Sequence, residues 1–243
     1  EVRFLDVDFS YDKSKELLKN INLEVKSGGS IAIVGPTGAG KTTLVNLLLR
    51  FYEIDRGKIT IDNVDIRDMS KTDLRKLFGI VLQDTWLESG SIRENIAYAK
   101  DPTDLEKIKE AAKKAHIDHF IETLPHGYDT IINEDVSNIS QGEKQLMTIA
   151  RAILADPKIL ILDEATSSVD TKTESYIQNA MTAMMKGKTS FIIAHRLSTI
   201  RNASLILVMD KGKIVEQGNH DELIKRKGFY HNLYNSQFLA QNI

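Results

Sequence analysis

The chain has 243 residues, of which 42% are hydrophobic and 27% charged, and its formal net charge is -2 at pH 7. This balance is typical of a folded globular protein and argues against a basic nucleic-acid-binding surface. The chain contains no cysteine, which excludes disulfides and thiolate metal sites. No apolar run approaches the roughly 20 residues that span a bilayer, so the chain itself is expected to be soluble. It begins at Glu1 without an initiator methionine, so we expect a segment of a longer protein.

The N-terminal part begins with strands that alternate apolar and polar side chains. Residues 2–9 and 21–25 follow this pattern, which is typical of half-buried strands. Residues 58–66 have the pattern of a hairpin that turns at Asp62-Asn63. Together these pieces predict an antiparallel sheet near the N-terminus.

Later strands are apolar at consecutive positions. The runs cover residues 30–35, 78–83, 158–164, 189–195 and 204–210. Continuous apolar strands separated by helical segments indicate a parallel sheet that is buried on both faces.

A helical stretch interrupts these strands between about residues 91 and 154, most clearly at 105–115 and 144–154. We interpret it as a helical subdomain inserted into an α/β core. The C-terminal tail has the pattern of a helix, a break at Gly228 and a second, amphipathic helix.

The glycine-rich stretch GPTGAGKTT joins the buried strand at 30–35 to a helical run, which is the context that a phosphate-binding P-loop requires. Its glycines let the backbone curl so that successive amides point at phosphate oxygens, and the helix adds its positive end. Lys41 would reach the β- and γ-phosphates, and the Thr42 hydroxyl would bind Mg²⁺. A plain glycine turn with an incidental lysine is the alternative. The predicted phosphate site comprises Gly35, Pro36, Thr37, Gly38, Ala39, Gly40, Lys41, Thr42 and Thr43.

A buried strand at 159–164 ends in two carboxylates, Asp163 and Glu164, at the edge where open α/β sheets bind ligands. Asp163 suits the Mg²⁺ shell, and Glu164 is a candidate general base for a water that attacks the γ-phosphate. Alone, such a pair is more often a surface turn, but the P-loop reverses that balance. The predicted fold class is therefore α/β: a P-loop NTPase core with a mostly parallel sheet, an N-terminal antiparallel β-subdomain and an inserted helical subdomain.

Taken in order, the motifs resemble those of the nucleotide-binding domain of an ATP-binding cassette (ABC) transporter of the exporter type. They cover nearly the whole chain: FSY at 9–11, GPTGAGKTT at 35–43, VLQDTWLESGSIRENI at 81–96, NISQGEKQ at 138–145, ILILDEATSSVD at 159–170 and IIAHRL at 192–197. The resemblance implies one ABC ATPase domain over residues 1–243. Its RecA-like core with the β-subdomain would occupy about 1–90 and 155–243, and its helical subdomain with the signature motif about 91–154.

The resemblance also gives roles to residues that would be unremarkable alone. It implies that Tyr11 stacks on adenine, and that Gln83 touches the Mg²⁺ shell and senses the membrane domain. It places the catalytic glutamate at Glu164 and the histidine that contacts the γ-phosphate at His195, with Lys41 and Gln83 completing the catalytic set. The residues implied for the metal are Thr42, Gln83 and Asp163.

In this family two such domains pack head to tail, and each ATP lies between one P-loop and the signature motif of the other domain. Here Ser140, Gly142 and Glu143 would reach the ATP of the partner. The usual signature is Leu-Ser-Gly-Gly-Gln, whereas this chain has Ile139-Ser140-Gln141-Gly142-Glu143. Gln141 and Glu143 therefore depart from the pattern in bulk and in charge.

Glu143 supports two interpretations. Ser140 and Glu143 fit a Ser-x-x-Glu capping box, in which glutamate and glutamine serve equally, so the change would be tolerated. Alternatively, a carboxylate ~8 Å from the γ-phosphate would repel it by about 2 kcal/mol at an effective dielectric of ~20 and weaken closure over ATP.

The full set of hydrolytic residues beside an altered signature favours a heterodimer, in which this chain donates the catalytic half of one site and a deviant signature to the other. The implied function is ATP-driven export through a transmembrane domain, at the cytoplasmic face of the cell membrane, with ATP and Mg²⁺ as cofactors and no nucleic acid.

A soluble ABC protein acting on DNA or ribosomes would need a basic face or long coiled coils, neither of which is visible. A GTPase would need an Asn-Lys-x-Asp motif, and no Asn-Lys pair occurs. A module that binds ATP without turnover stays open, although Glu164 argues against it.

Overall fold

The computed structural model of the chain describes residues 1–13, 16–82, 85–98, 100–132, 139–163, 169–194 and 197–239, and only the backbone of 198 and 237–239. The chain divides into two units. The first holds residues 1–78, 161–164 and 187–243, and the second holds residues 79–160 and 165–186.

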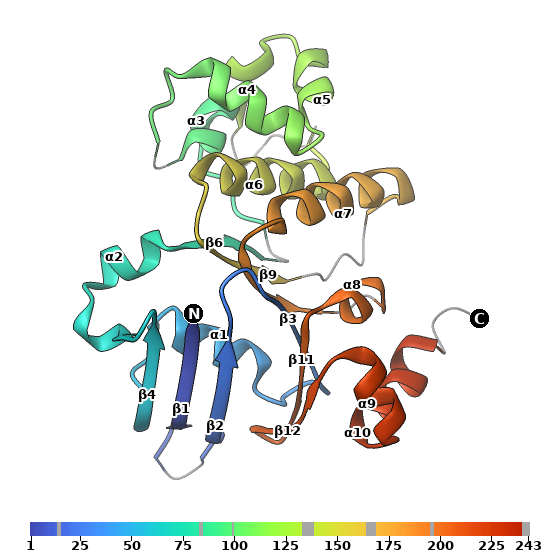
Figure 1. The fold of residues 1–243 in the computed structure, drawn as a ribbon. Helices are drawn as coiled ribbons and strands as arrows, with labels where there is room; N and C mark the ends of the chain where they lie inside the picture. Colours follow the sequence, from blue (N-terminus) through green and yellow to red (C-terminus); the bar gives the residue numbers. More distant parts are fainter. Residues whose placement is uncertain are drawn as a thin grey trace. The chain divides into compact units, whose positions relative to one another are not determined.

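The first unit begins with an antiparallel sheet of order β2-β1-β4-β5. The bounds are Val2–Phe9 for β1, Leu18–Val25 for β2, Arg56–Ile61 for β4 and Val64–Asp65 for β5. β1 lies between β2 and β4 (Figure 1). Buried Phe4 of β1 lies opposite buried Leu23 of β2 and buried Ile59 of β4. Asp62 and Asn63 both have positive φ (48° and 68°), as in a type I′ hairpin turn. The predicted sheet and its hairpin are confirmed.

A second sheet has the strand order β12-β11-β3-β10-β9-β6. The bounds are Ser30–Val34 for β3, Phe78–Val81 for β6, Ile159–Asp163 for β9, Thr189–Ile193 for β10, Leu205–Asp210 for β11 and Lys213–Gly218 for β12. β3 pairs in parallel with both β10 and β11, and every residue of β10 is buried, so the predicted mostly parallel sheet is confirmed. β12 is an antiparallel edge strand without buried residues, and an apolar pattern therefore does not predict it.

The helices of the first unit follow strands of both sheets. The bounds are Lys41–Leu48 for α1, Ile66–Asp68 for the 3₁₀ turn η1, Lys71–Lys76 for α2, Leu197–Asn202 for α8, His220–Arg226 for α9, Phe229–Leu233 for α10 and Tyr234–Leu239 for the π-helical turn η3. Gly228 lies between α9 and α10 as the N-cap residue of α10, so the predicted break in the tail is confirmed.

The second unit is mostly helical. Its bounds are Gly90–Ser91 for β7, Ile92–Ala97 for α3, Leu105–Lys114 for α4, Asp118–Thr123 for α5, Gly127–Asp129 for the 3₁₀ turn η2, Ile131–Ile132 for β8, Gln141–Ala155 for α6 and Thr171–Met185 for α7. α6 packs against α3, α4 and α7 (Figure 1). The buried side chains of α6 include Leu146 and Ile149. The two helices predicted most clearly, at 105–115 and 144–154, are confirmed as α4 and α6.

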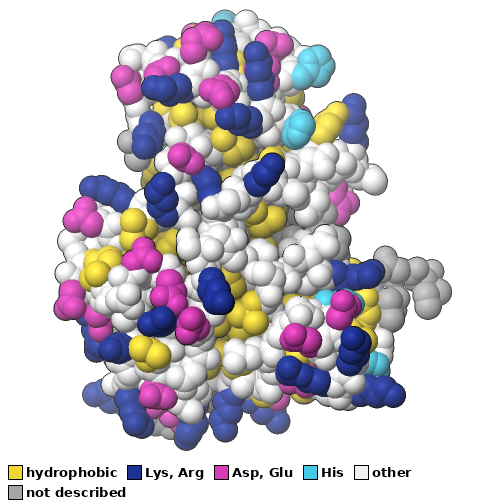
Figure 2. Space-filling model, viewed as in Figure 1, with side chains coloured by type: hydrophobic (Ala, Val, Ile, Leu, Met, Phe, Trp, Pro, Cys, Tyr) yellow, Lys and Arg dark blue, Asp and Glu magenta, His cyan; other side chains and the backbone are white. Residues whose placement is uncertain are grey.

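Acidic and basic side chains are interspersed over the face shown in Figure 2, in agreement with the small net charge. Within the described residues, no helix combines the length and the apolar character needed to cross a bilayer.

The turn between β11 and β12 fastens the P-loop to the sheet through Gly212. The Gly212 amide donates to the carbonyl of Ala39 at 3.1 Å, and its own carbonyl accepts from the Lys19 amide at 3.0 Å. Gly212 has φ +75°, and a side chain there would overlap the carbonyl oxygen of Leu17. Glycine is therefore required at this position both for its conformation and for the close approach of β2.

Gly212→Ala should lower the free energy of unfolding more than Gly187→Ala. Gly187 is a matched control, because it has the same φ of +75° but no atom lies within 4 Å of the Cβ that alanine would add. The control should cost roughly 1–2 kcal/mol, the usual penalty of the left-handed conformation. The clash with Leu17 should add about 1–3 kcal/mol to that penalty. Denaturant unfolding measures both variants, and equal losses would show that the close approach of β2 has no energetic consequence.

Candidate functional site

The P-loop joins β3 to α1 through a backbone that only glycine adopts readily. Gly35, Gly38 and Gly40 all have positive φ (152°, 79° and 100°), and Gly40 is the N-cap residue of α1. No acidic residue lies in the first turn of α1, so no carboxylate of this turn offsets the positive end of the helix. The predicted need for glycine in this loop is confirmed by these φ values. A glycine-rich loop that leads into a helix N-terminus is a common arrangement for binding anions.

Lys41 folds over this loop. Its ammonium donates to the carbonyl oxygens of Gly35, at 2.7 Å, and Pro36, at 3.0 Å. Burial lowers the pKa of Lys41, while the charge of Asp163 acts in the opposite direction. The cation is therefore held at the loop by partial charges, a position from which it can transfer to phosphate oxygens.

Asp163 and Thr42 supply oxygen atoms of the type that Mg²⁺ prefers. Asp163 is the last residue of β9 and is close enough to Lys41 to perturb its pKa, and Thr42 is an exposed residue of the first turn of α1. A carboxylate and a hydroxyl fit the hard-oxygen ligand set of Mg²⁺, so the chemistry of these donors agrees with the predicted metal.

Tyr11 lies beside the phosphate loop. Its hydroxyl shares a hydrogen bond of 3.3 Å with the hydroxyl of Thr43 in α1. The Tyr11 ring is more than half exposed and also touches the rings of Phe9 and Tyr52. An exposed aromatic face next to the P-loop can stack on a planar base. The FSY motif at 9–11 predicts Tyr11 as a site residue but does not predict its contact with Tyr52, although the adjacent aromatic residues Phe51 and Tyr52 after α1 are visible in the sequence.

The N-terminus of α6 has the predicted capping box. The Ser140 amide donates to the carboxylate of Glu143 at 2.7 Å, and the Glu143 amide donates to the hydroxyl of Ser140 at 3.3 Å. One oxygen of the carboxylate is therefore engaged within its own helix turn. Glutamine could make the same bond through its side-chain carbonyl.

Two neighbours of Glu143 in α6 also have defined contacts. A side chain at Gly142 would put its Cβ 2.5 Å from Thr173 and 2.9 Å from Val169, so α7 and the residues before it leave room only for glycine. The Gln141 amide nitrogen donates to the hydroxyl of Thr85 at 3.0 Å and ties the first turn of α6 to the segment after β6. The sequence pattern shows that Gln141 is bulkier than the glycine of the usual signature, but it does not predict this hydrogen bond.

Glu143 also lines a hollow of about 500 Å³ between the helices of the second unit. Lys113 and Lys172 line the same hollow, and the rings of His116 and Tyr176 stack at 5.4 Å beside it. Asp118 lines the hollow as well, so the surroundings of Glu143 contain side chains of both charges.

The predicted site residues fall into three groups. The P-loop, Tyr11 and Asp163 belong to the first unit, and Ser140, Gly142 and Glu143 belong to the second. Gln83, Glu164 and His195 lie outside the described residues.

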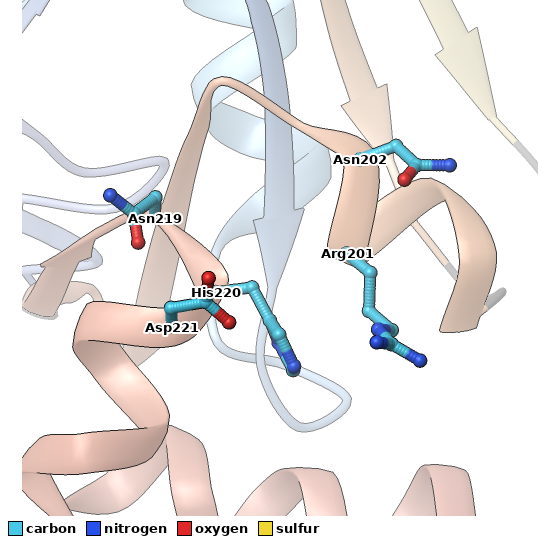
Figure 3. Close-up of a pocket in the computed structure, with 5 residues that line it drawn as sticks. All are labelled: Arg201, Asn202, Asn219, His220 and Asp221. Carbon is cyan, nitrogen blue, oxygen red and sulfur yellow. The ribbon is translucent and has the colours of Figure 1, made fainter.

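A different hollow of about 450 Å³ lies in the first unit, where α8 ends and α9 begins. The side chains of Arg201 and His220 extend in the same direction there, and Asn202 points away from them (Figure 3). Burial and the charge of Arg201 lower the pKa of His220, and its Nδ1 lies 2.8 Å from the hydroxyl of buried Tyr230. This histidine has a structural partner, and the described residues that line the hollow include no glycine-rich loop.

Comparisons with known proteins agree with the motifs. The profile of the family described as ABC transporter matches residues 18–167. The chain is 56% identical, over 96% of its length, to 37% of the fatty acid ABC transporter ATP-binding/permease protein of Mycobacterium tuberculosis. It is 52% identical, over 97% of its length, to 41% of the ATP-dependent lipid A-core flippase of Desulfotalea psychrophila. A bacterial Atm1-family ABC exporter solved with ATP bound is 45% identical and superposes with a TM-score of 0.89, over 97% of this chain and 41% of that one. The chain thus spans about two-fifths of the relatives it matches.

Lys41→Ala should weaken ATP binding by about tenfold to a hundredfold, because it would remove the charge-assisted contact that is predicted between Lys41 and the phosphates. Titration calorimetry with Mg-ATP measures the loss. Lys76→Ala is the control, since Lys76 is an exposed lysine of the same unit that pairs with Asp73 at 3.2 Å. Similar affinities for both variants would mean that Lys41 does not bind the phosphates.

Proposed function

Because this chain belongs to the ABC transporter family and forms the ATP-binding domain of its exporters, we propose that its P-loop site binds Mg-ATP and that hydrolysis there drives export through a transmembrane domain. The observation that carries the proposal is the Lys41 ammonium, which lies 2.7 Å from the Gly35 carbonyl across a loop of positive-φ glycines. This arrangement supplies the amides and the charge that a triphosphate needs.

Hydrolysis is assigned to residues around the γ-phosphate. Glu164 would orient and deprotonate the attacking water, His195 would contact the γ-phosphate, and Lys41 would stabilise the charge that develops on it. Thr42, Gln83 and Asp163 would hold Mg²⁺, which when bound neutralises charge on the phosphate oxygens. Phosphoryl transfer requires little covalent chemistry from the protein. The positioning of the water, the γ-phosphate and Mg²⁺ by these residues would therefore account for catalysis.

The second half of each ATP site would come from another nucleotide-binding domain. Ser140 and Gly142, together with the capping carboxylate of Glu143, would face the ATP of the partner. A complete hydrolytic set beside an altered signature favours a heterodimer over a homodimer. The capping bond of Glu143 supports the interpretation that glutamate is tolerated in place of the usual glutamine, because the carboxylate accepts a hydrogen bond within its own helix turn.

The segment between β6 and α4 is suited to contact the transmembrane domain. The side chains of Trp86 and Tyr98 are exposed, and Arg151 of α6 holds the segment in place. The Arg151 guanidinium donates to the Asn95 carbonyl at 2.8 Å and the Trp86 carbonyl at 3.4 Å, and it lies 4.5 Å from the centre of the Tyr98 ring. Exposed aromatic side chains on an anchored backbone fit an interface with another domain, which would lie at the cytoplasmic face of the membrane.

Glu164→Gln should abolish most turnover, by at least about a hundredfold, since it removes the general base. ATP binding should persist because the phosphate loop is unchanged. Glu143→Gln should change turnover little, because glutamine also caps α6. Steady-state ATPase assays and calorimetry on both variants check this, and the reverse pattern of losses would refute the assignment.

The dependence of ATPase activity on protein concentration tests the choice of partner. Two copies that form one site would give an activity that rises with the square of the concentration. The heterodimer proposal expects activity proportional to the concentration of this chain alone, with an increase when the partner domain is added. A quadratic dependence would support self-pairing and contradict the heterodimer.

A further inference from the structure

Three aromatic rings meet beside the phosphate loop. The Tyr11 ring centre lies 4.9 Å from that of Phe9 and 4.8 Å from that of Tyr52, with interplanar angles of 85° and 84°. The rings of Phe9 and Tyr52 lie 5.8 Å apart and complete the cluster. Tyr11 thus has two edge-to-face contacts, each of which restricts the tilt of its ring.

The three rings differ in exposure. Phe9 is 3% exposed and belongs to the core, whereas Tyr52 is 45% and Tyr11 53% exposed. Two half-exposed tyrosines in contact are not needed to fill a core. Their exposed surface instead remains available to a ligand next to the P-loop.

Tyr52 lies on a segment that is anchored by hydrogen bonds both before and after it in the chain. Asp55 donates its amide to the Asp8 carbonyl at 3.0 Å, which ties the segment to the end of β1. The Arg50 guanidinium donates to the carbonyls of Ile66, at 3.1 Å, and Met69, at 3.0 Å. The backbone around Tyr52 is therefore anchored, and its ring can act as a fixed stop for the ring of Tyr11.

The Tyr11 ring is held at its other end by the hydroxyl bond of 3.3 Å to Thr43. Thr43 follows Lys41 and Thr42 at the start of α1. The orientation of the Tyr11 ring is therefore fixed relative to the phosphate loop by Thr43, and relative to the anchored segment by Tyr52.

We propose that Tyr52 is a positioning residue for the base of the nucleotide: it fixes the plane of Tyr11 so that a purine base stacks there while the triphosphate occupies the P-loop. The proposal rests on the nucleotide binding proposed above and adds a residue that acts through Tyr11. A ring held in place before binding loses less conformational entropy when the base arrives, and the gain appears as affinity for the base part only.

The test compares two probes that share the phosphate loop. Mg-ATP carries a base, and inorganic tripolyphosphate with Mg²⁺ does not. In the purified chain, Tyr52→Ala should weaken ATP binding by about three- to tenfold, the range expected for an edge-to-face aromatic pair, and leave tripolyphosphate binding unchanged. In turnover assays the change should appear in KM, with kcat unaltered.

Control variants distinguish the effect of the aromatic ring of Tyr52 from the effect of its apolar bulk and from the effect of neighbouring residues. Tyr52→Phe keeps the ring edge and should bind ATP like the unaltered chain, whereas Tyr52→Leu keeps apolar bulk without the edge and should behave like Tyr52→Ala. Phe51→Ala is the matched control. Phe51 is 49% exposed and packs under the Arg75 guanidinium at 4.9 Å, outside the cluster of Phe9, Tyr11 and Tyr52.

Equal losses for ATP and tripolyphosphate in Tyr52→Ala would overturn the proposal, because they would indicate general damage to the site. An effect of Phe51→Ala on ATP as large as that of Tyr52→Ala would overturn it too. If the unaltered chain bound neither probe, the proposed nucleotide binding would itself fail, and that outcome is distinct from a failure of the role of Tyr52 alone.

Discussion

The Lys41 ammonium is withdrawn partly from water and rests on carbonyl oxygens of its own loop. Such a cation needs partners of opposite polarity, and two carbonyls satisfy it less fully than a triphosphate would. The loop can present those carbonyls only because its glycines adopt positive φ, and it keeps its shape because β3 is buried behind it and Gly212 bonds to Ala39. Two further residues of the predicted site lie close to this loop. Asp163 is placed near it by β9, and Tyr11 by its bond to α1.

In the second unit, the structure gives a local reason for the carboxylate of Glu143 in the first turn of α6. Glu143 accepts the Ser140 amide, one of the donors that a helix start leaves without an intrahelical partner. Its charge is favourable to the positive end of α6 and is bonded locally. Gly142 is required by the packing of α7, whatever it faces outside the chain. Local helix stability and the binding of a ligand thus place demands on the same short sequence.

Two pairs of exposed aromatic residues are held in place by different contacts. Tyr11 and Tyr52 hold each other beside the phosphate loop, and Trp86 and Tyr98 lie on a segment that Arg151 fastens to α6. In both cases polar bonds fix the backbone and leave ring surface exposed. This combination suits recognition, because a partner or base then meets a surface that is already ordered.

The sequence by itself determined the strand–loop–helix of the P-loop, both sheets apart from the edge strand β12, the helices α4 and α6, and the capping box of Ser140 and Glu143. These features depend on periodicity, glycine and neighbouring side chains, all of which are local. The tertiary structure alone decided that Gly212 supports Ala39, that Gly142 faces Thr173, that Gln141 bonds to Thr85 and that Tyr52 touches Tyr11. Each of these contacts joins residues far apart in the chain, and their meeting depends on the path of the backbone between them, which no local pattern encodes.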